Sequence, residues 1–531
     1  MIHFRRIEPL VQNIMQSVAL LLTPVMSFTV FALSAQANSF RLEEASIADI
    51  HAALKSGLTC RELTSLYLER IQAYDKKGPA INSIITLNPQ ALALADSKDA
   101  LFNKSGLNDP LHCIPVVLKD NVDTKDLPTT GASMTLQGSI PPDDAVITSK
   151  LKAAGAIVIA KANLHEFAAW GETISSLGGQ TRNPYDLSRT PGGSSGGTGA
   201  AIAANFGAVG IGTDTVNSTR SPASANSLVG LKPTMGLVSR SGIIPYSLTQ
   251  DMAGPITRTV TDTAKVLDAI AGYDPADPVT AWSVGHIPQS YTRFLQAGGL
   301  KGARIGVVQN LFGSEPEHAV VNDVIRAAIA QMQQQGATIV SVNIPGLDAD
   351  QLVSDVSVHL YELKPHLQSY LQRLGSAAPV KTFDEIVASG KTHPSLQDIL
   401  QKAQSLSTDD PEYKSRLLKR LELQQTLVKV MADYQLDAFV YPHQRQLVVP
   451  IGESQIGRNG VVGAVTGFPA ITVPAGFSPQ SQSAPIGVPV GIEFLGRPWS
   501  EPILLRLAYS FEQATKYRRP PISTPPLART P

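Results

Sequence analysis

Cysteine is nearly absent from this chain of 531 residues, which contains only Cys60 and Cys113. Two cysteines cannot supply the disulfide framework on which small loop-rich secreted folds depend, so that class of scaffold is excluded. We expect both side chains to be free structural thiols. Hydrophobic residues make up 43% of the sequence, which is enough for a sizeable core without a covalent framework.

Charge is also scarce, and it is balanced. Charged residues are 17% of the chain, and 44 Lys and Arg residues offset 44 Asp and Glu residues to give a net charge of zero. The sequence has no basic block and no repeat of fixed period. A nucleic acid or an anionic membrane surface would require a basic patch, so we expect neither as a partner.

Long apolar runs are missing except near the N-terminus, at residues 18–33. Two arginines precede this run, and Ala35 and Ala37 follow it as the small residues of a cleavage site. The pattern predicts a secretory signal peptide over residues 1–37, a mature chain that begins at Asn38, and export to the periplasm or the exterior. An uncleaved anchor is the alternative, but the run is shorter than the roughly 20 apolar residues of a membrane span.

The rest of the chain has the pattern of an α/β protein. The apolar run 114–118 is typical of a buried parallel strand. A helix over 145–153 and a second strand over 156–160 follow it as a βαβ unit, so we expect a mixed, mostly parallel sheet. Further along we expect a second such unit over 303–343, helices over 349–436, strands over 437–442, 471–476 and 488–496, a helix over 501–514 and an irregular Pro-rich tail over 518–531.

Lys119 ends the first of these strands and has two interpretations. Its amine could reach solvent while the stem stays buried. Alternatively, burial could lower its pKa and leave a neutral amine that acts as a base. The strand alone leaves both open.

Residues 192–220 form the centre of the sequence: a Gly-Ser loop, an Ala-rich helix, a short apolar strand and a second serine-bearing turn. The loop contains the G-x-S-x-G pattern of a nucleophile elbow, but an elbow must follow a strand directly. The preceding residues 183–191 are polar and bracketed by proline, which excludes the elbow. A flexible linker is also excluded, because the loop lies between apolar segments.

These motifs resemble the amidase signature family, serine hydrolases built on a Ser–Ser–Lys triad. The resemblance covers roughly residues 45–515 and implies a single large α/β domain, from about residue 38 to 531, with a sheet covered by helices on both faces. The motifs that carry it are Lys119-Asp120-Asn121, the loop Gly192–Gly197 and the segment Gly212–Arg220, followed by Gly230–Thr234, Gln250–Pro255, Gly467–Ala470, Pro489–Gly491 and Gly496–Pro498.

The resemblance also implies roles for individual residues. Ser218 would be the nucleophile, Ser194 the bridging serine after a cis peptide bond, and Lys119 the base. Backbone N–H groups of the turn would bind the oxyanion, and the substrate would be a small-molecule amide, with no metal or cofactor. The oxyanion residues would be Thr215, Val216, Asn217 and Ser218, and the supporting residues Ser195, Asp214 and Arg220.

Val216 and Asn217 stand where the family commonly has two glycines. If the turn requires a positive φ, it should fall at Asn217, because a β-branched residue tolerates positive φ poorly. We expect Val216 to pack behind the turn and Asn217 to make a polar contact near the site. His165 is expected to be a packed or surface residue.

The function expected from these motifs is hydrolysis of a carboxylic acid amide through an acyl-serine intermediate. An esterase or a C-terminal peptide amidase on the same triad is the alternative, as is an amidase-like binding protein without catalysis. The glutaminase subunit of a tRNA-amidating complex is disfavoured, because this chain starts with an export signal. The acyl group, the amine and the oligomeric state are left open.

Overall fold

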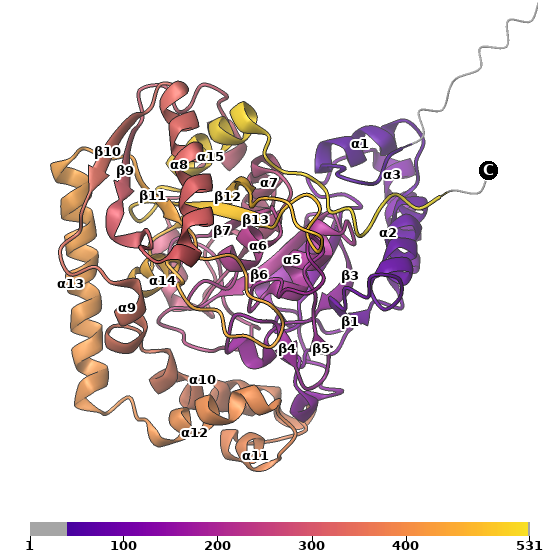
Figure 1. Ribbon diagram of the computed structural model, residues 1–531. Coiled ribbons are helices and arrows are strands. Elements are labelled where there is room, and N and C mark those ends of the chain that lie inside the picture. Colours follow the sequence, from indigo (N-terminus) through magenta and orange to yellow (C-terminus); the bar gives the residue numbers. More distant parts are fainter. Residues whose placement is uncertain (1–39, 529–531) are drawn as a thin grey trace, which may run out of the picture. The chain divides into compact units, whose positions relative to one another are not determined.

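The computed structural model describes residues 40–528, so the predicted signal peptide and its cleavage site lie outside the described residues. From Arg41 onward the chain is one compact unit. As expected, it is a single large α/β domain in which helices flank one large sheet (Figure 1). Among residues 40–528, no helix combines the length and the apolar character that crossing a bilayer requires.

The sheet has eleven strands and is mixed. Parallel pairs join β3, β2 and β6 near one end and β11, β9 and β10 at the other, and the strands between them are antiparallel. In spatial order the strands are β1 (Ile84–Leu87), β3 (Ile157–Ala162), β2 (Pro115–Lys119), β6 (Val209–Asp214), β8 (Met252–Thr257), β7 (Val229–Lys232), β12 (Ala470–Phe477), β13 (Pro489–Leu495), β11 (Ala438–Pro442), β9 (Arg304–Val308) and β10 (Thr338–Val342), with a separate hairpin of β4 (Ile174–Ser175) and β5 (Gly179–Gln180).

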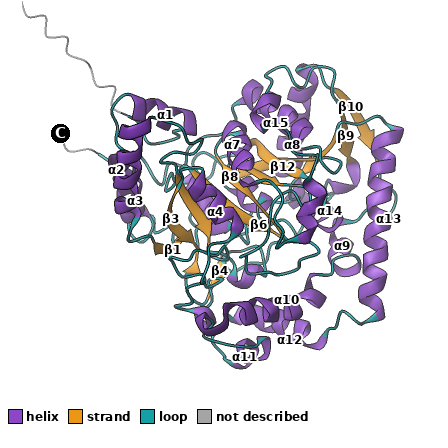
Figure 2. Ribbon diagram, turned by 180° about the vertical axis from the view of Figure 1, so that it is seen from behind, coloured by secondary structure: helices purple, strands orange, loops and turns teal. Residues whose placement is uncertain are grey.

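Helices cover both faces of the sheet (Figure 2). Helices α5 and α6 pack against one face, and α7, α8 and α15 form a layer on the other. Every residue of β2, β3 and β6 is buried, as double cover requires. The helices are α1 (Ile47–Lys55), α2 (Cys60–Tyr74), α3 (Ala91–Ser105), α4 (Val146–Ala153), α5 (Gly196–Ala203), α6 (Arg220–Ala225), α7 (Val260–Ile270), α8 (Ala319–Gln334), α9 (Ala349–Asp355), α10 (His359–Leu374), α11 (Phe383–Ala388), α12 (Gln397–Ser405), α13 (Pro411–Asp433), α14 (Val461–Thr466) and α15 (Glu501–Thr515).

The predicted helical region, residues 349–436, forms α9 to α13. Helices α10, α11 and α12 gather beside one another, and the long α13 runs along one side (Figures 1 and 2). Leu363 and Leu367 of α10 pack in a hydrophobic cluster with Phe167 and Tyr246, which belong to loops from the first half of the chain. This contact holds the helical region over the sheet edge described below.

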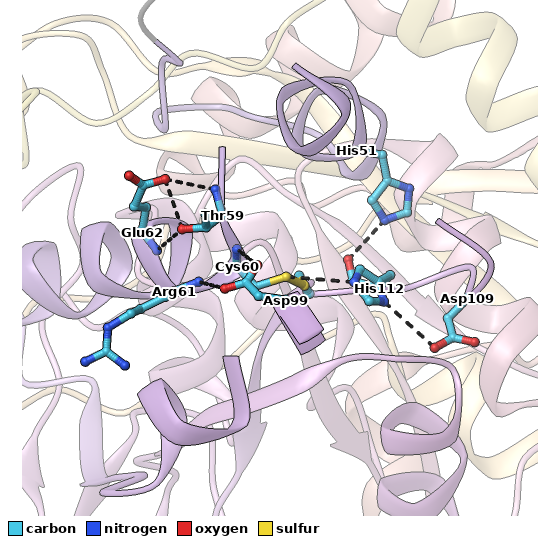
Figure 3. Close-up of a disulfide and its surroundings, with 9 residues drawn as sticks. His51, Thr59, Cys60, Arg61, Glu62, Asp99, Asp109 and His112 are labelled. Carbon is cyan, nitrogen blue, oxygen red and sulfur yellow. Dashed lines mark hydrogen bonds and ion pairs between the residues drawn. A yellow bond between two sulfur atoms is a disulfide. The ribbon is translucent and has the colours of Figure 1, made fainter. Parts of the chain in front are cut away.

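The expectation of two free thiols is wrong: Cys60 and Cys113 form a disulfide (Figure 3). Cys60 is the first residue of α2, and Cys113 lies just before β2, with their Cα atoms 5.5 Å apart. The two residues are 53 positions apart in the sequence and meet only because α2 docks beside the start of this strand. A cross-link that closes a loop of this size typically stabilises a fold by about 4 kcal/mol. It ties the N-terminal helices to the strand that carries Lys119.

His112 lies against this disulfide (Figure 3). Its Nε2 is 3.8 Å from the Cys60 sulfur, and its Nδ1 faces the Asp109 carboxylate at 3.9 Å. The ring and the two sulfur atoms are close enough to surround a metal ion, but the disulfide bond uses both sulfurs. Burial lowers the pKa of His112, so the ring is a neutral packing group here.

Candidate active site

The site lies where the carboxyl ends of β2 and β6 meet. These strands are parallel, with Leu118 opposite Ile211, so the residues that follow emerge at one edge of the sheet. Lys119 ends β2 and Asp214 ends β6. The antiparallel β8 starts at the same edge, with Met252 opposite Asp214. The K-D-N and G-T-D motifs therefore meet at this edge of the sheet.

Lys119 is completely buried, which rules out the interpretation that its amine reaches solvent. Its Nζ donates hydrogen bonds to Ser194 Oγ at 2.7 Å and to Thr213 Oγ1 at 2.8 Å. Burial lowers the pKa of Lys119 to about 7, although the negative charges of Asp214 and Asp251 act in the opposite direction. A substantial fraction of this amine is therefore neutral near pH 7 and can accept a proton.

The loop that carries Ser194 is held by contacts with its backbone, and its glycine positions leave no room for side chains. The Gly193–Ser194 peptide bond is cis, as the resemblance implies. The Ser194 carbonyl accepts a hydrogen bond from the His165 backbone N–H at 3.0 Å, and Thr173 Oγ1 donates to the Gly192 carbonyl at 2.7 Å. A Cβ at Gly197 would collide with the backbone of Asn163. The glycines of the loop thus allow the close approach that presents Ser194 to Lys119.

Ser195 connects the loop to the strand and to the second serine-bearing turn. Its Oγ donates to the Thr213 carbonyl at 3.2 Å, and the Thr213 N–H donates back to the same Oγ at 3.3 Å. Its backbone N–H donates to the Ser218 carbonyl at 3.2 Å. Ser195 therefore fixes the distance between the Ser194 loop and the Ser218 turn.

Ser218 lies in the turn between β6 and α6 and is 6% exposed at the floor of a cavity. Within residues 40–528, the backbone N–H groups of Val216, Asn217 and Ser218 have no hydrogen-bond partner. Neither Val216 nor Asn217 has a positive φ, so the turn keeps an ordinary backbone without the family's glycines. Thr215, which also lines the cavity, is fixed by a hydrogen bond from its Oγ1 to Asp251 Oδ1 at 2.5 Å.

Arg220 and Asp214 brace this turn from behind. Arg220 Nε and Nη2 donate to the two Asp214 oxygens at 3.0 and 3.1 Å, and Asp214 Oδ2 also accepts from the Thr219 N–H at 3.0 Å. Burial alone would raise the pKa of Asp214, but Arg220 holds it below its ordinary value. Arg220 also donates to the Val216 carbonyl at 3.1 Å, which fixes the start of the turn directly.

The sequence analysis missed Glu493, which completes this buried network. Its carboxylate pairs with Arg220 and His443, and it accepts from the Tyr441 hydroxyl at 2.9 Å. Burial opposes its charge, but Arg220 holds the pKa of Glu493 below its ordinary value. The available signal was an acidic residue inside the otherwise apolar run of β13.

The cavity above Ser218 has a volume of about 350 Å³. Val216 packs against the hydrophobic cluster behind the turn, as expected. It also lines the cavity, as does Asn217. The Asn217 Nδ2 is buried and has no partner among residues 40–528, so the expected polar contact is not made within the protein. The helical region closes the cavity with residues of α9, α10 and α12.

His165 is a packed residue, as expected. It is 1% exposed, and its Nδ1 accepts from the Glu172 backbone N–H at 3.3 Å. Its contacts with the Ser194 carbonyl and with Glu172 support the loop and do not reach Ser218.

Comparison with known proteins agrees with this geometry. A probable amidase of Arabidopsis thaliana is 36% identical over 507 residues, covering 91% of this chain and 92% of the relative. A glutamyl-tRNA(Gln) amidotransferase subunit of Caldanaerobacter subterraneus is 35% identical over 489 residues, covering 88% of this chain and 95% of the relative. The native peptide amidase of Stenotrophomonas maltophilia has a similar structure, with 39% identity, a TM-score of 0.82, and coverage of 91% of this chain and 99% of that one.

The family model named Amidase matches residues 62–505, a span that contains the Lys119 strand, the Gly-Ser loop and the Ser218 turn. The relatives and the solved structure cover nearly the whole described domain. Together with the motifs placed at one sheet edge, these matches establish that the chain belongs to the amidase signature family of enzymes, which hydrolyse the C–N bond of amides.

Proposed function

We propose that Lys119, Ser194 and Ser218 act as a catalytic triad in which Ser218 is the nucleophile. The observation that carries the proposal is the buried Lys119 amine, with its pKa near 7, 2.7 Å from Ser194 Oγ. A serine hydroxyl is a weak nucleophile unless a base removes its proton. Ser194 Oγ accepts a hydrogen bond from the amine, and the next residue, Ser195, donates its backbone N–H to the Ser218 carbonyl, so Ser194 is close enough to the turn to pass the proton from Ser218 to Lys119.

The reaction then has two halves. Ser218 Oγ attacks the amide carbonyl carbon, and its proton moves through Ser194 to Lys119. The same relay returns a proton to the departing nitrogen, which leaves as ammonia or an amine while the acyl group stays on Ser218. A water molecule, deprotonated through the relay, cleaves the acyl ester and releases the carboxylic acid.

The backbone N–H groups of Val216, Asn217 and Ser218, with that of Thr215, are proposed to bind the oxyanion of the tetrahedral intermediates. Donors fixed before the reaction stabilise developing charge most effectively, and removal of one typically costs about a hundred- to a thousandfold in rate. Arg220 and Asp214 act as positioning residues, because their bonds set the path of this turn.

A linear carboxamide is the proposed substrate, and a C-terminal peptide amide is a second candidate. Two observations favour the peptide: the likeness to the peptide amidase structure, and a second cavity of about 880 Å³ that shares lining residues with the first and lengthens the site. An esterase activity on the same residues remains part of the proposal. A glutaminase role within a tRNA-amidating complex is not proposed, because the N-terminal sequence favours export.

A hydrolysis screen tests the proposed function. Ammonia release is expected from short aliphatic, aryl or C-terminal peptide amides, with a rate that is at least about tenfold higher for the preferred class. Esters of the same acids serve as the comparison. A protein that binds amides but releases neither ammonia nor an amine from any of these classes would be a binding protein, contrary to the proposal.

We propose that the chain is exported and cleaved before Asn38. The support is the apolar run with its small-residue site, together with a disulfide, which persists in oxidising compartments. Protein recovered from the exported fraction is expected to begin at Asn38 and to contain no thiol that reacts with Ellman's reagent until it is unfolded and reduced. An intact Met1, or two reactive thiols in unreduced protein, would contradict the proposal.

A further inference from the structure

The cavity above Ser218 and the second cavity share a wall. Trp170, Asp350, Val353 and Arg458 line both of them. Arg458 is the one cation among these four, and it comes from the segment between β11 and α14. Any acyl group that extends from Ser218 towards the larger cavity passes this wall.

The Arg458 guanidinium lies over the Trp170 ring, and no described residue accepts a hydrogen bond from it. Its Cζ lies 5.5 Å from the centroid of the Trp170 ring. Within residues 40–528 it forms no hydrogen bond and no ion pair, although it is only partly exposed and has five N–H donors to satisfy. The group keeps some contact with solvent, so its donors are free to bind an anion that enters the cavity.

Nearby carboxylates do not neutralise Arg458. Glu172 and Asp350 favour its charged form from a distance, but each has another partner. The Glu172 carboxylate accepts hydrogen bonds from the backbone N–H groups of Gln455 at 2.8 Å and Gly171 at 3.0 Å, and Asp350 pairs with Arg445. The positive charge at the shared wall is therefore available to a bound molecule.

The cavity of Ser218 is cationic as a whole. Lys402, Arg416 and Arg458 line it, opposed by the single carboxylate of Asp350. Arg416 is held by Glu412 at 3.0 Å and by the Ser357 carbonyl at 2.9 Å, and Lys402 is exposed on α12. Arg458 is thus the cation whose donors are both unpaired and partly shielded from water, where a charge-assisted hydrogen bond is strongest.

We propose that Arg458 binds a carboxylate on the acyl part of the substrate, so that the preferred substrates are amides whose acyl group carries a second, ionised carboxyl group. The proposal rests on the proposed function, because it concerns the acyl group that Ser218 would attack. The planar guanidinium matches a carboxylate through two parallel N–H···O bonds, and the Trp170 ring lies against one side of the group.

Matched substrates test this inference. Monoamides of straight-chain dicarboxylic acids, from malonic to suberic acid, are compared with the diamides of the same acids, which have the same length but no charge. Wild-type protein is expected to prefer the monoamide of one chain length by at least about tenfold in kcat/KM per amide group. Arg458→Gln should lower kcat/KM on that monoamide by about 10- to 100-fold and change it on the diamide by less than about threefold.

Lys402→Gln is the matched control, because it removes an exposed cation from the same cavity. It should change the monoamide-to-diamide ratio by less than about threefold. Arg458→Lys, which keeps the charge but loses the planar fork, should recover only part of the preference. Equal losses from Lys402→Gln and Arg458→Gln would assign the preference to the overall charge of the cavity and overturn the role of Arg458.

A binding experiment separates this inference from the proposed function. Ser218→Ala protein is titrated calorimetrically with the dicarboxylates of the same chain lengths. A double variant that also carries Arg458→Gln is expected to bind them at least about tenfold more weakly. Diamide hydrolysis without any preference for a monoamide, and without Arg458-dependent binding, would overturn the Arg458 inference and leave the proposed function intact. Arg458-dependent binding without hydrolysis of any amide would support the inference and overturn the function.

Discussion

Ser218→Ala protein is expected to hydrolyse amides at least about 10⁴-fold more slowly than wild type, because the alanine has no oxygen with which to form the acyl intermediate. Wild-type protein should also be labelled by a serine-directed fluorophosphonate, with one label per chain on the peptide that contains Ser218, and the variant should take up none. The two measurements are ammonia release and mass spectrometry of the labelled peptide.

Ser224→Ala is the matched control for this experiment. Ser224 is a buried serine of the neighbouring α6, and its Oγ accepts from the Gly491 N–H at 3.0 Å without lining the cavity of Ser218. Its loss should lower stability by about 1 kcal/mol and leave the labelling unchanged. Full labelling of Ser218→Ala protein would place the nucleophile at another residue.

The centre of the site could be predicted because its parts are close in sequence. Residues 192–220 fold as the loop, helix, strand and turn that the sequence indicates, with α5 and β6 between the two serines. The predicted strand–helix–strand units are confirmed in β2–α4–β3 and β9–α8–β10, each with a parallel strand pair. Local periodicity and short crossovers specify these units almost completely.

Contacts between distant segments could not be predicted in this way. Cys60 meets Cys113 because α2 docks at the start of β2, and no spacing rule links two such positions. Glu493 reaches Arg220 only through the antiparallel pairing that places β13 among the central strands. A strand covered on both faces has the same apolar pattern in either direction, so the sequence carries little information on that pairing.

Val216 and Asn217 show why motif knowledge can also mislead. Their family counterparts are commonly glycines, which suggests a turn with positive φ, yet neither residue adopts one. The turn is instead held from behind, by Arg220 at the Val216 carbonyl and by Gln250 at the Thr215 carbonyl, at 3.1 and 3.0 Å. Because external hydrogen bonds set the backbone, side chains at these positions are free to form part of the cavity wall.

The proposed role of Lys119 gives the activity a defined pH dependence. The neutral amine is the base, and protonation removes it, so activity should fall as the pH drops through the pKa of about 7. Below that midpoint kcat/KM should decrease by about tenfold per pH unit, so that at pH 5 it is about a hundredfold below the plateau. The burial that lowers the pKa of Lys119 is therefore the property that places the plateau at neutral to mildly alkaline pH.

Lys119→Ala should lower kcat on amides by about 10³- to 10⁴-fold. It should lower kcat on activated esters by only about tenfold. An amine leaves only after it receives a proton from the relay of Lys119 and Ser194, whereas a phenolate leaves without one, so the two substrates depend on the base to different degrees. The measurement is kcat for a matched amide and phenyl ester of one acid, from pH 5 to pH 9. The residual ester activity of the variant should no longer change at a midpoint near pH 7, because the group that titrates there has been removed. Equal losses on both substrates, or a midpoint that survives the substitution, would show that Lys119 holds Ser194 in place and does not carry the proton.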